Sequence, residues 1–260
     1  MFNTQILGFS LYNIVYYFLV YSFLGWCLET TYVTYIDGKF TNRGFLNGPF
    51  CPIYGFGATL IIVLLNPIDN VIILFIAAII LTTILEYITG YVLEKLFNTV
   101  WWDYSERFLN IKGRVCLYFS LIWGFLSLFL IVIIHPITKN FLRLIPTSYG
   151  SIFIYIISLY FLIDLSITIT SIVELNLKLK KLNVLSNEIK TKLHHLKDVT
   201  DDKEESIEAK IKELRRRYNN VISKRINLHA RLIKAFPNIR SNKFNHILKD
   251  VKKHIERLYK

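Results

Sequence analysis

Charged residues are scarce in the first two thirds of this 260-residue chain, although its formal net charge is +12. Up to Val173 the sequence holds eight Lys or Arg and eight Asp or Glu, so the whole positive excess follows this residue. Only 19% of the chain is charged and 53% is hydrophobic, whereas a soluble globular domain is about 25% charged. This composition excludes a soluble enzyme with one core, a disordered chain and a disulfide-stapled secreted domain.

Several motifs that would identify a chemistry are also absent. The three cysteines, Cys27, Cys51 and Cys116, are an odd number without C-x-x-C spacing or a nearby His cluster, which predicts free thiols rather than a metal or redox site. The chain has no G-x-x-x-x-G-K-[ST] motif and so cannot itself be a P-loop ATPase. We find no catalytic constellation, so we predict no catalytic residue, no bound metal, no cofactor and no enzymatic activity.

Long apolar segments dominate instead. A membrane-spanning helix needs roughly 20 apolar residues, because each residue rises 1.5 Å through a hydrocarbon core of about 30 Å. Four segments are long enough: Ile6–Leu28, Val71–Leu93, Val115–Ile134 and Ser151–Val173. Phe50–Leu65 is shorter, and is either a fifth span that starts near Phe45 or a re-entrant segment. We predict the span, and therefore an all-α, polytopic membrane protein with five transmembrane helices in residues 1–173 and a helical tail in residues 174–260.

The distribution of basic residues predicts an orientation. Five spans place the two termini on opposite sides of the membrane, and the positive-inside rule places the tail, with its 23 Lys and Arg, in the cytoplasm. The N-terminus is then outside, and the loops that carry Lys39, Arg43 and Lys95 are inside. Lys139 and Arg143 fall outside and are the exception.

An internal repeat connects the first four spans. At an offset of 65 residues, the segment from Gly25 to Glu29 aligns with the segment from Gly90 to Glu94, and Cys51 aligns with Cys116. The alignment predicts two parallel span-loop-span repeats, at about 6–65 and 71–134, followed by the last span, 151–173. Chance similarity between apolar segments is the alternative.

Acidic side chains in or beside the spans are the candidate functional residues, because a charge in the bilayer costs about 2.5–3.5 kcal/mol on insertion scales. Glu86 and Asp164 lie within spans, and the spans contain no Lys or Arg that could pair with them. The predicted polar site comprises Glu29, Glu86, Glu94, Asp103, Asp164, Arg43, Arg107 and Arg114. Glu29, Glu86 and Asp164 either line a path for a cation or a proton, or serve as structural links between helices. In the structural alternative, Glu29 and Glu94 pair with arginines of the loops.

Three stretches carry a resemblance to a known family. They read GWCLET from Gly25, NRGFLNGPFCPIYGFGA from Asn42 and WWDYSERFLNIKGRVCLYFSLIWG from Trp101. The region from about Phe18 to Phe129 resembles the bacterial membrane proteins described as putative ABC-transporter type IV, or CmpB-type permeases. The resemblance implies a permease component of a transporter in the bacterial inner membrane, with a separate ATPase chain as partner and a substrate that the sequence does not identify. A non-transporting membrane scaffold that recruits partners through its tail is the alternative function.

The tail has helical periodicity. Apolar residues recur every three or four positions from Leu175 to Leu196 and again from Ile207 to Ala235, as in coiled coils. The two helices either fold back as a hairpin around Lys197–Glu205 or form an intermolecular coiled coil in a homo-oligomer. We predict the hairpin, because this segment is rich in helix-capping residues: Asp198, Thr200, Asp201 and Asp202.

A last short helix is predicted after Pro237. Apolar residues lie on one of its faces, and basic residues surround them: Phe244, Ile247, Leu248, Val251, Ile255 and Leu258, with Lys249, Lys252, Lys253 and Arg257. A basic amphipathic helix of this kind is typical of binding to anionic lipid. Nucleic acid is an unlikely partner, because the chain lacks a recognised nucleic-acid-binding motif.

Overall fold

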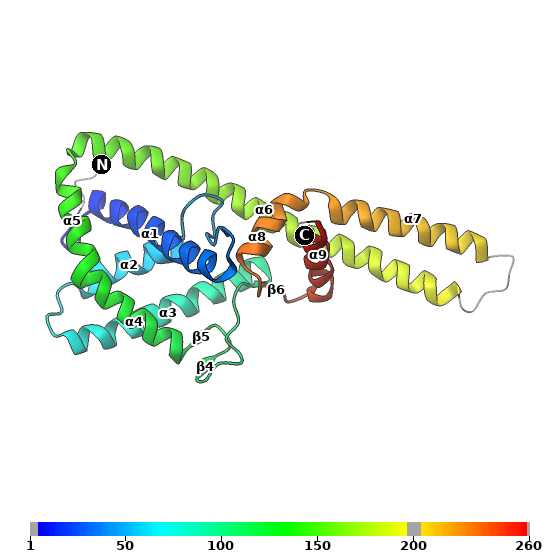
Figure 1. Ribbon diagram of the computed structural model, residues 1–260, viewed down its shortest axis with the longest axis horizontal. Coiled ribbons are helices and arrows are strands. Elements are labelled where there is room, and N and C mark those ends of the chain that lie inside the picture. The colour runs from blue at the N-terminus through cyan, green and yellow to red at the C-terminus, as the bar shows by residue number, and fades with distance from the viewer. Residues whose placement is uncertain (1–4, 197–203, 259–260) are drawn as a thin grey trace. The chain divides into compact units, whose positions relative to one another are not determined.

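A computed structural model describes residues 5–196 and 204–258 of the chain (Figure 1). Helix makes up 77% of the structure and strand 5%, which confirms the predicted all-α class. The chain forms two compact units. Unit 1 contains Met1–Lys95 and Trp101–Thr168, and unit 2 contains Leu96–Val100 and Ile169–Lys260.

The helices of unit 1 follow one another along the chain, with long connections after α1 and after α3 (Figure 1). They are α1 (Leu11–Asp37), α2 (Pro52–Leu65), α3 (Val71–Phe97), α4 (Leu117–Phe129), the π-helical turn η1 (Leu130–Ile134), α5 (His135–Leu144) and the first part of α6 (Thr147–Leu196). Two short hairpins accompany them: β1 (Gln5–Ile6) with β2 (Phe9–Ser10), and β4 (Asn110–Ile111) with β5 (Val115–Cys116).

Local chemistry sets the ends of these helices. The Ser10 hydroxyl accepts a hydrogen bond from the Asn13 backbone N–H at 3.3 Å and caps α1, which ends at Gly38 with a φ of 65°. Such a left-handed residue closes a helix at least cost when it is glycine. The Asn70 side chain caps α3 by accepting hydrogen bonds from the backbone N–H groups of Ile72 and Ile73.

Four helical stretches are long and apolar enough to cross a membrane: Leu11–Asp37, Val71–Phe97, Leu117–Leu144 and Thr147–Leu196. They coincide with four of the five predicted segments. The first span begins at Leu11 rather than Ile6, because the chain reverses between β1 and β2 at Leu7 and Gly8, which both have positive φ.

The fifth predicted span is not confirmed, because α2 is short. Its 14 residues rise about 21 Å, which is less than the hydrocarbon core of about 30 Å. The helix begins only at Pro52, since the residues before it run as an extended segment beside α1. The prediction located the apolar segment correctly but overestimated its helical length.

The exposed surface of α3 carries a stripe of isoleucines. The isoleucines at 72, 76, 80, 84 and 88 recur every fourth residue, and each is at least 51% exposed. Residues with this spacing lie on one helical face. Soluble proteins rarely expose so long an apolar stripe, so this face is suited to contact with lipid.

The core of unit 1 is unusually rich in tyrosine. Four buried tyrosines of α1, Tyr12, Tyr16, Tyr17 and Tyr21, belong to a cluster that also contains Phe161 of α6. The Tyr21 hydroxyl and His135 Nδ1 share a buried hydrogen bond of 3.0 Å. A buried hydroxyl needs such a partner, and this contact connects α1 to the start of α5.

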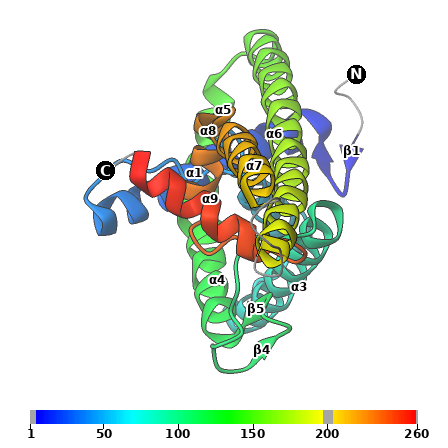
Figure 2. The ribbon, with the colours of Figure 1, turned by 90° about the vertical axis from the view of Figure 1, so that its right-hand side faces the viewer.

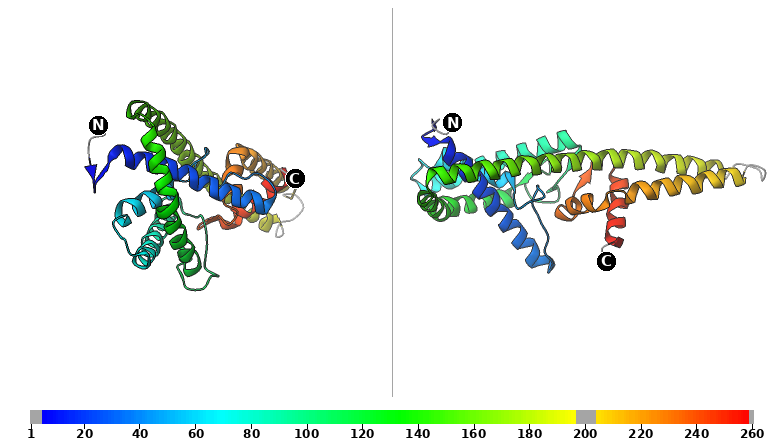
Figure 3. Two further views of the ribbon diagram at one scale, coloured as in Figure 1. Left: turned by 60° about the vertical axis from the view of Figure 1, so that its left-hand side comes forward. Right: turned by 90° about the horizontal axis from the view of Figure 1, so that it is seen from above.

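Unit 2 contains a helical hairpin, formed by the second part of α6 and α7 (Glu204–Ser223). Two further helices follow, α8 (Ile226–Ala235) and α9 (Asn245–Leu258). The helix α7 lies alongside the second half of α6 (Figures 1–3). Leu179 and Leu182 of α6 and Ile211 and Ile222 of α7 are buried. Within one chain α7 thus packs against α6, as a hairpin requires, while the intermolecular coiled coil stays an alternative prediction; the predicted capping residues Asp198, Thr200, Asp201 and Asp202 lie outside the described residues.

The turn from α7 to α8 is held against α6 by charged groups. Arg225, which interrupts the apolar pattern of the tail, occupies this turn with a φ of 51° and pairs with Glu174 at 2.6 Å. The Lys178 ammonium donates a hydrogen bond to the Lys224 carbonyl oxygen at 2.8 Å. The interruption in the sequence pattern thus marks the end of one helix and the start of the next.

The apolar face of α9 is not free to enter lipid. Ile247, Leu248, Val251 and Ile255 are all buried within unit 2. The expected amphipathic helix is present, but its apolar residues pack inside the unit, because burial there removes them from water equally well. Any attraction of α9 to anionic lipid must therefore come from its exposed basic residues.

The end of α3 is part of unit 2. Strand β3 (Thr99–Val100) pairs antiparallel with β6 (Arg240–Ser241). The Asn176 side chain donates to the Phe97 carbonyl oxygen at 2.7 Å, and the Asn242 backbone N–H donates to the Asn98 carbonyl oxygen at 3.1 Å. These bonds connect a membrane-spanning helix directly to the tail.

Unit 2 is expected to loosen in mild acid because of His229 in α8. Burial lowers the pKa of His229 to about 4, and the nearby positive charge of Lys178 adds to the effect. His229 therefore binds a proton more readily in the unfolded state than in the folded state. As the pH falls below the pKa of His229 in the unfolded chain, the free energy of unfolding decreases. Between roughly pH 7.5 and roughly pH 5 we expect unit 2 to lose about 2 kcal/mol.

Hydrogen exchange of α8 amides in the detergent-solubilised full chain, corrected for intrinsic exchange rates, measures this loss. The variant His229→Gln removes the titrating group and should abolish the pH dependence. His246→Gln, at an exposed position of α9, should retain it. Equal protection of wild-type α8 across the pH range would contradict the expectation.

Candidate functional site

The segment between α1 and α2, residues 38–51 and here called connector 1, folds back along α1. The Thr41 and Arg43 backbone N–H groups donate to the side-chain oxygens of Thr34 and Thr30, each at 3.4 Å. Further on, the Cys51 backbone N–H donates to the Ser22 carbonyl oxygen at 2.9 Å. The contacts move towards the N-terminus of α1 as the connector advances. Connector 1 therefore reaches the middle of a predicted span without being helical.

Asp164 of α6 holds the innermost part of connector 1. One carboxylate oxygen accepts hydrogen bonds from the Asn47 backbone N–H at 3.0 Å and its side-chain Nδ2 at 2.8 Å. The other oxygen accepts from the Gly48 backbone N–H at 2.6 Å. Asp164 is only 5% exposed. Its charge is thus spread over three donors, and it serves as a ligand for the backbone rather than as an open ion site.

Gly48 is required at this contact. A Cβ atom on Gly48 would lie 2.3 Å from the Tyr160 hydroxyl and 3.0 Å from the second Asp164 carboxylate oxygen. Any side chain here would push the backbone N–H away from the carboxylate. A glycine at position 48 therefore has a steric reason.

A second side chain, Asn42, organises connector 1 from within. Its Oδ1 accepts from the Trp26 indole N–H and from the Gly44 backbone N–H, each at 2.8 Å. Its Nδ2 donates to the Asn47 carbonyl oxygen at 2.7 Å. Non-helical backbone is tolerated at membrane depth only where protein groups satisfy its hydrogen bonds, and Asn42 and Asp164 supply several of them.

Glu29, near the end of α1, is neutralised by connector 1 and α2. The Tyr54 hydroxyl donates a short hydrogen bond to one Glu29 oxygen, and Arg43 Nε lies 3.9 Å from the other. Gly25 makes room for this tyrosine, because a Cβ there would lie 2.3 Å from the Tyr54 side chain. The spacing Gly25 to Glu29 is one helical turn, which places both on one face of α1.

Glu94 of α3 has a stronger partner. Arg114 Nη2 lies 2.5 Å from a Glu94 carboxylate oxygen, and Nε of the same arginine donates to that oxygen at 3.1 Å. The guanidinium also lies 5.4 Å from the ring centres of both Tyr87 and Tyr91. Aromatic faces favour a cation at this distance. Glu94 and Arg114 therefore form an ion pair that joins α3 to the segment that precedes α4.

Asp103 and Arg107 shape the second connector, residues 101–116 and here called connector 2. Asp103 accepts a hydrogen bond from the Ser105 backbone N–H at 2.9 Å and so stabilises a turn. Arg107 is exposed, and its guanidinium lies 6.0 Å from the centre of the Tyr118 ring. Neither residue belongs to the group around Glu29 and Glu86.

Glu86 is the acid with the weakest neutralisation. It is 7% exposed, and one oxygen accepts a hydrogen bond of 3.3 Å from the Tyr104 hydroxyl of connector 2. Its other oxygen is buried with no hydrogen-bond partner among the residues that the structure describes. The Trp123 indole Nε1 of α4 lies close to this carboxylate but makes no hydrogen bond to it.

Aromatic contacts join the two halves of unit 1. The Tyr54 ring packs edge-on against Trp123 with ring centres 5.4 Å apart, and Phe45 of connector 1 lies 5.3 Å from Trp101 of connector 2. Glu29, Tyr54, Glu86, Tyr104 and Trp123 are here called the acidic–aromatic cluster. The prediction identified its two carboxylates but not its aromatic members.

The sequence held one signal for the missed residues. At the repeat offset of 65, Tyr54 aligns with Phe119, which cannot donate a hydrogen bond. Phe119 instead stacks on Tyr104, with ring centres 4.7 Å apart. Tyr104 therefore provides in the second copy the hydroxyl that Tyr54 provides in the first, but from a different element. Each copy also has a 27-residue helix and a cysteine before its second helix, while the repeat itself stays a prediction.

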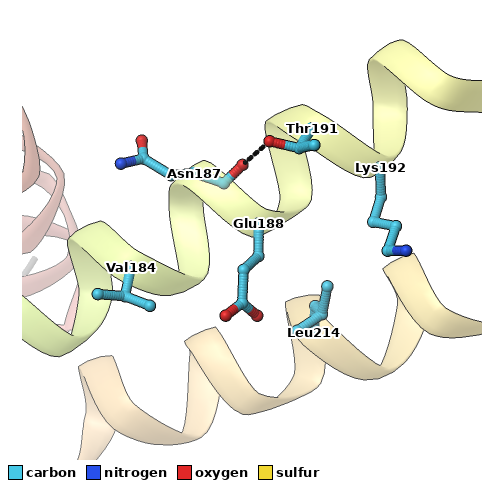
Figure 4. A pocket seen from close by; sticks show the side chains of 6 residues that line it. All are labelled: Val184, Asn187, Glu188, Thr191, Lys192 and Leu214. Atoms are coloured by element: carbon cyan, nitrogen blue, oxygen red, sulfur yellow. Dashed lines mark hydrogen bonds between the residues drawn. The ribbon is translucent and has the colours of Figure 1, made fainter.

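A groove of about 400 Å³ lies in unit 2, between α6 and α7 (Figure 4). Its lining residues are Val184, Asn187, Glu188, Thr191, Lys192 and Leu214. None of the eight predicted site residues contributes to it. Within residues 5–196 and 204–258, no group of three or more His, Cys, Asp or Glu side chains could hold a metal ion.

Comparison with known proteins gives one match. The family described as "Putative ABC-transporter type IV" matches residues 16–169, which is more than half of the chain. The matched region contains the whole acidic–aromatic cluster, both connectors and Asp164. No curated protein and no solved structure matches the chain.

Asp164→Asn is expected to release connector 1 from α6. The amide cannot accept at both positions, so at least one buried backbone N–H of Asn47 or Gly48 loses its partner, at a cost of about 1–3 kcal/mol. Hydrogen exchange across residues 42–51 should accelerate accordingly, while α3 should be unaffected. Ser166→Ala, at an exposed position on the same helix, is the matched control; unchanged exchange in the Asp164 variant would refute the anchoring role.

Proposed function

Because the chain belongs to the family described as "Putative ABC-transporter type IV", we propose that it is a membrane-embedded component of a transporter. The long apolar helices of the structure are consistent with this role. The observation that carries the proposal further is the acidic–aromatic cluster. A poorly neutralised carboxylate within an apolar spanning helix is a functional candidate by default, because its insertion is costly.

The energy source of this transporter is proposed to be a separate chain. ABC systems use ATP, and this sequence lacks the glycine-rich loop and lysine that would cradle its phosphates. The protein would then supply the membrane path and bind a P-loop ATPase, without being an enzyme itself. The cluster is acidic, so the species that meets it is expected to be cationic.

The proposed orientation places the N-terminus outside and the basic tail in the cytoplasm of a bacterial cell. Connector 1 and α2 follow each other along α1 in the same direction, so together they complete one crossing that α2 is too short to make alone. This arrangement supports five membrane crossings, and an odd number of crossings places the two termini on opposite sides of the membrane. The positive-inside rule then assigns the side, because 23 of the 31 basic residues follow Val173.

Anionic lipid is the proposed partner of the tail. The basic residues of α9 that are exposed include Lys249, Lys253 and Arg257. Since the apolar face of α9 is buried, the attraction would be electrostatic and would weaken with salt. It would add to membrane attachment rather than replace a span.

A second function, a non-transporting scaffold, is favoured by one observation. Asp164, one of the two acids within predicted spans, is fully used in holding connector 1. A scaffold would need the tail for recruitment but would not need Glu86. The two functions therefore differ in which part of the chain is essential.

Purification of the full chain from cross-linked native membranes tests the transporter. We expect a P-loop ATPase to copurify, and its ATP hydrolysis in proteoliposomes to rise several-fold when this protein is present. The double variant Glu29→Gln, Glu86→Gln should lose most of that stimulation, whereas Glu106→Gln, at an exposed site, should retain it. Absence of an ATPase, together with a function that tolerates both cluster substitutions but not removal of the tail, would favour the scaffold.

A further inference from the structure

Five acidic side chains in unit 1 are at least half-buried, and one of them is partnered differently from the rest. Asp103 accepts hydrogen bonds from the Ser105 backbone N–H and hydroxyl. Glu94 has Arg114, Glu29 has Arg43 and the Tyr54 hydroxyl, and Asp164 has three N–H donors. Glu86 has one hydrogen bond, of 3.3 Å, from a neutral hydroxyl. Within the described residues no Lys or Arg pairs with it.

The position of Glu86 makes an ionised carboxylate without a cationic partner energetically unfavourable. The residue is in the middle of α3, the most apolar of the candidate spans, with a mean hydropathy of 2.6. The carboxyl is buried, and its second oxygen has no partner within residues 5–196 and 204–258. An unpaired charge in such surroundings is normally neutralised by a proton, because desolvation penalises only the charged form.

We propose that Glu86 is a proton-binding site, at which the unpartnered carboxylate oxygen of α3 takes a proton from water and returns it to water. Protonation forms one O–H bond on the Glu86 carboxylate and breaks one O–H bond of a hydronium ion, which leaves as water. The ligand of the site is therefore a single proton, and its release to water reverses the same two changes. The site needs no cavity larger than its own side chain, in agreement with the close aromatic packing around it.

Loss of the proton would change the packing of connector 2. A carboxylate attracts hydrogen-bond donors more strongly than a neutral acid does, and two donors face it: the Tyr104 hydroxyl from connector 2 and the Trp123 indole N–H from α4. Tyr104 also stacks on Phe119 of α4, and its backbone N–H donates to the Gly113 carbonyl oxygen at 2.8 Å. Movement of Tyr104 towards Glu86 would therefore move connector 2 as a unit.

The other titratable groups near this contact act through Tyr104. Burial, the Glu86 carboxyl, Cys116 and Glu29 all raise the pKa of the Tyr104 phenol, burial most of all. Tyr104 therefore keeps its proton in the physiological range and stays a donor. Glu86 is left as the carboxyl of the cluster that has no cationic partner among the described residues, whereas Glu29 has Arg43 and the Tyr54 hydroxyl.

This inference deepens the proposed function, since a proton-binding step in unit 1 could be coupled to transport. The coupling to transport rests on the proposed function, whereas proton binding by Glu86 does not. Proton binding can be measured without an ATPase or a substrate. Its failure would leave the family-based role intact, and failure to find an ATPase would leave the proton site intact.

Labelling with dicyclohexylcarbodiimide tests the site, because this apolar reagent modifies protonated carboxyls in apolar surroundings. The wild-type full chain in phosphatidylcholine–phosphatidylglycerol vesicles is labelled over a range from about pH 6 to about pH 9 and mapped by mass spectrometry. We expect modification of Glu86 that falls several-fold towards high pH. Glu94 and Asp164, whose carboxylates are held by Arg114 and by connector 1, should remain unmodified.

Two variants and one competition sharpen the result. Glu86→Gln should remove the label, and Glu106→Gln should not change it. Tyr104→Phe removes a donor that favours the carboxylate, so labelling of Glu86 at high pH should increase; a purely structural role for Tyr104 would not produce this shift. Absence of the label from Glu86 at every pH would overturn the proposal, and so would protection by sodium or potassium at constant pH, which would indicate a bound metal cation instead.

Discussion

Unit 1 depends on satisfying the backbone hydrogen bonds of a segment that is not helical. Connector 1 lies against the middle of α1, where water is not available to a membrane-embedded chain, so each buried N–H must find a partner in the protein. Asp164 accepts from two of these N–H groups, Asn42 from a third, and the Ser22 carbonyl from a fourth. The start of α2, and with it the position of Tyr54, follows from how this segment is held.

The need to satisfy buried polar groups also distinguishes the acids with a structural role from Glu86, whose carboxylate is only partly satisfied. Glu94 pairs with Arg114, and Asp164 accepts hydrogen bonds from connector 1, so both carboxylates hold connectors to helices. Glu86 lies in the same low-dielectric surroundings without an equivalent partner. Burial alone therefore does not identify a functional acid; the incomplete neutralisation of a buried acid does.

Unit 2 includes a short piece of chain, Leu96–Val100, that begins at the end of α3. The pairing of β3 with β6, together with Asn176 and Asn242, holds the residues that follow α3. The helix that carries Glu86 and Glu94 is therefore bonded at its end to unit 2.

Hydropathy and charge alone determined the membrane class, four of the spans, the basic tail and the acids worth examining, because those properties depend only on composition and local periodicity. The apolar face of α9 was also evident, but whether lipid or protein covers it depends on what packs against it. Likewise, Asp164 and Glu86 look alike in the sequence, each one acid in an apolar run. Only the tertiary structure distinguishes them. It brings the N–H groups of Asn47 and Gly48, more than a hundred residues away in the sequence, to the Asp164 carboxylate. It brings no comparable set of donors to the Glu86 carboxylate.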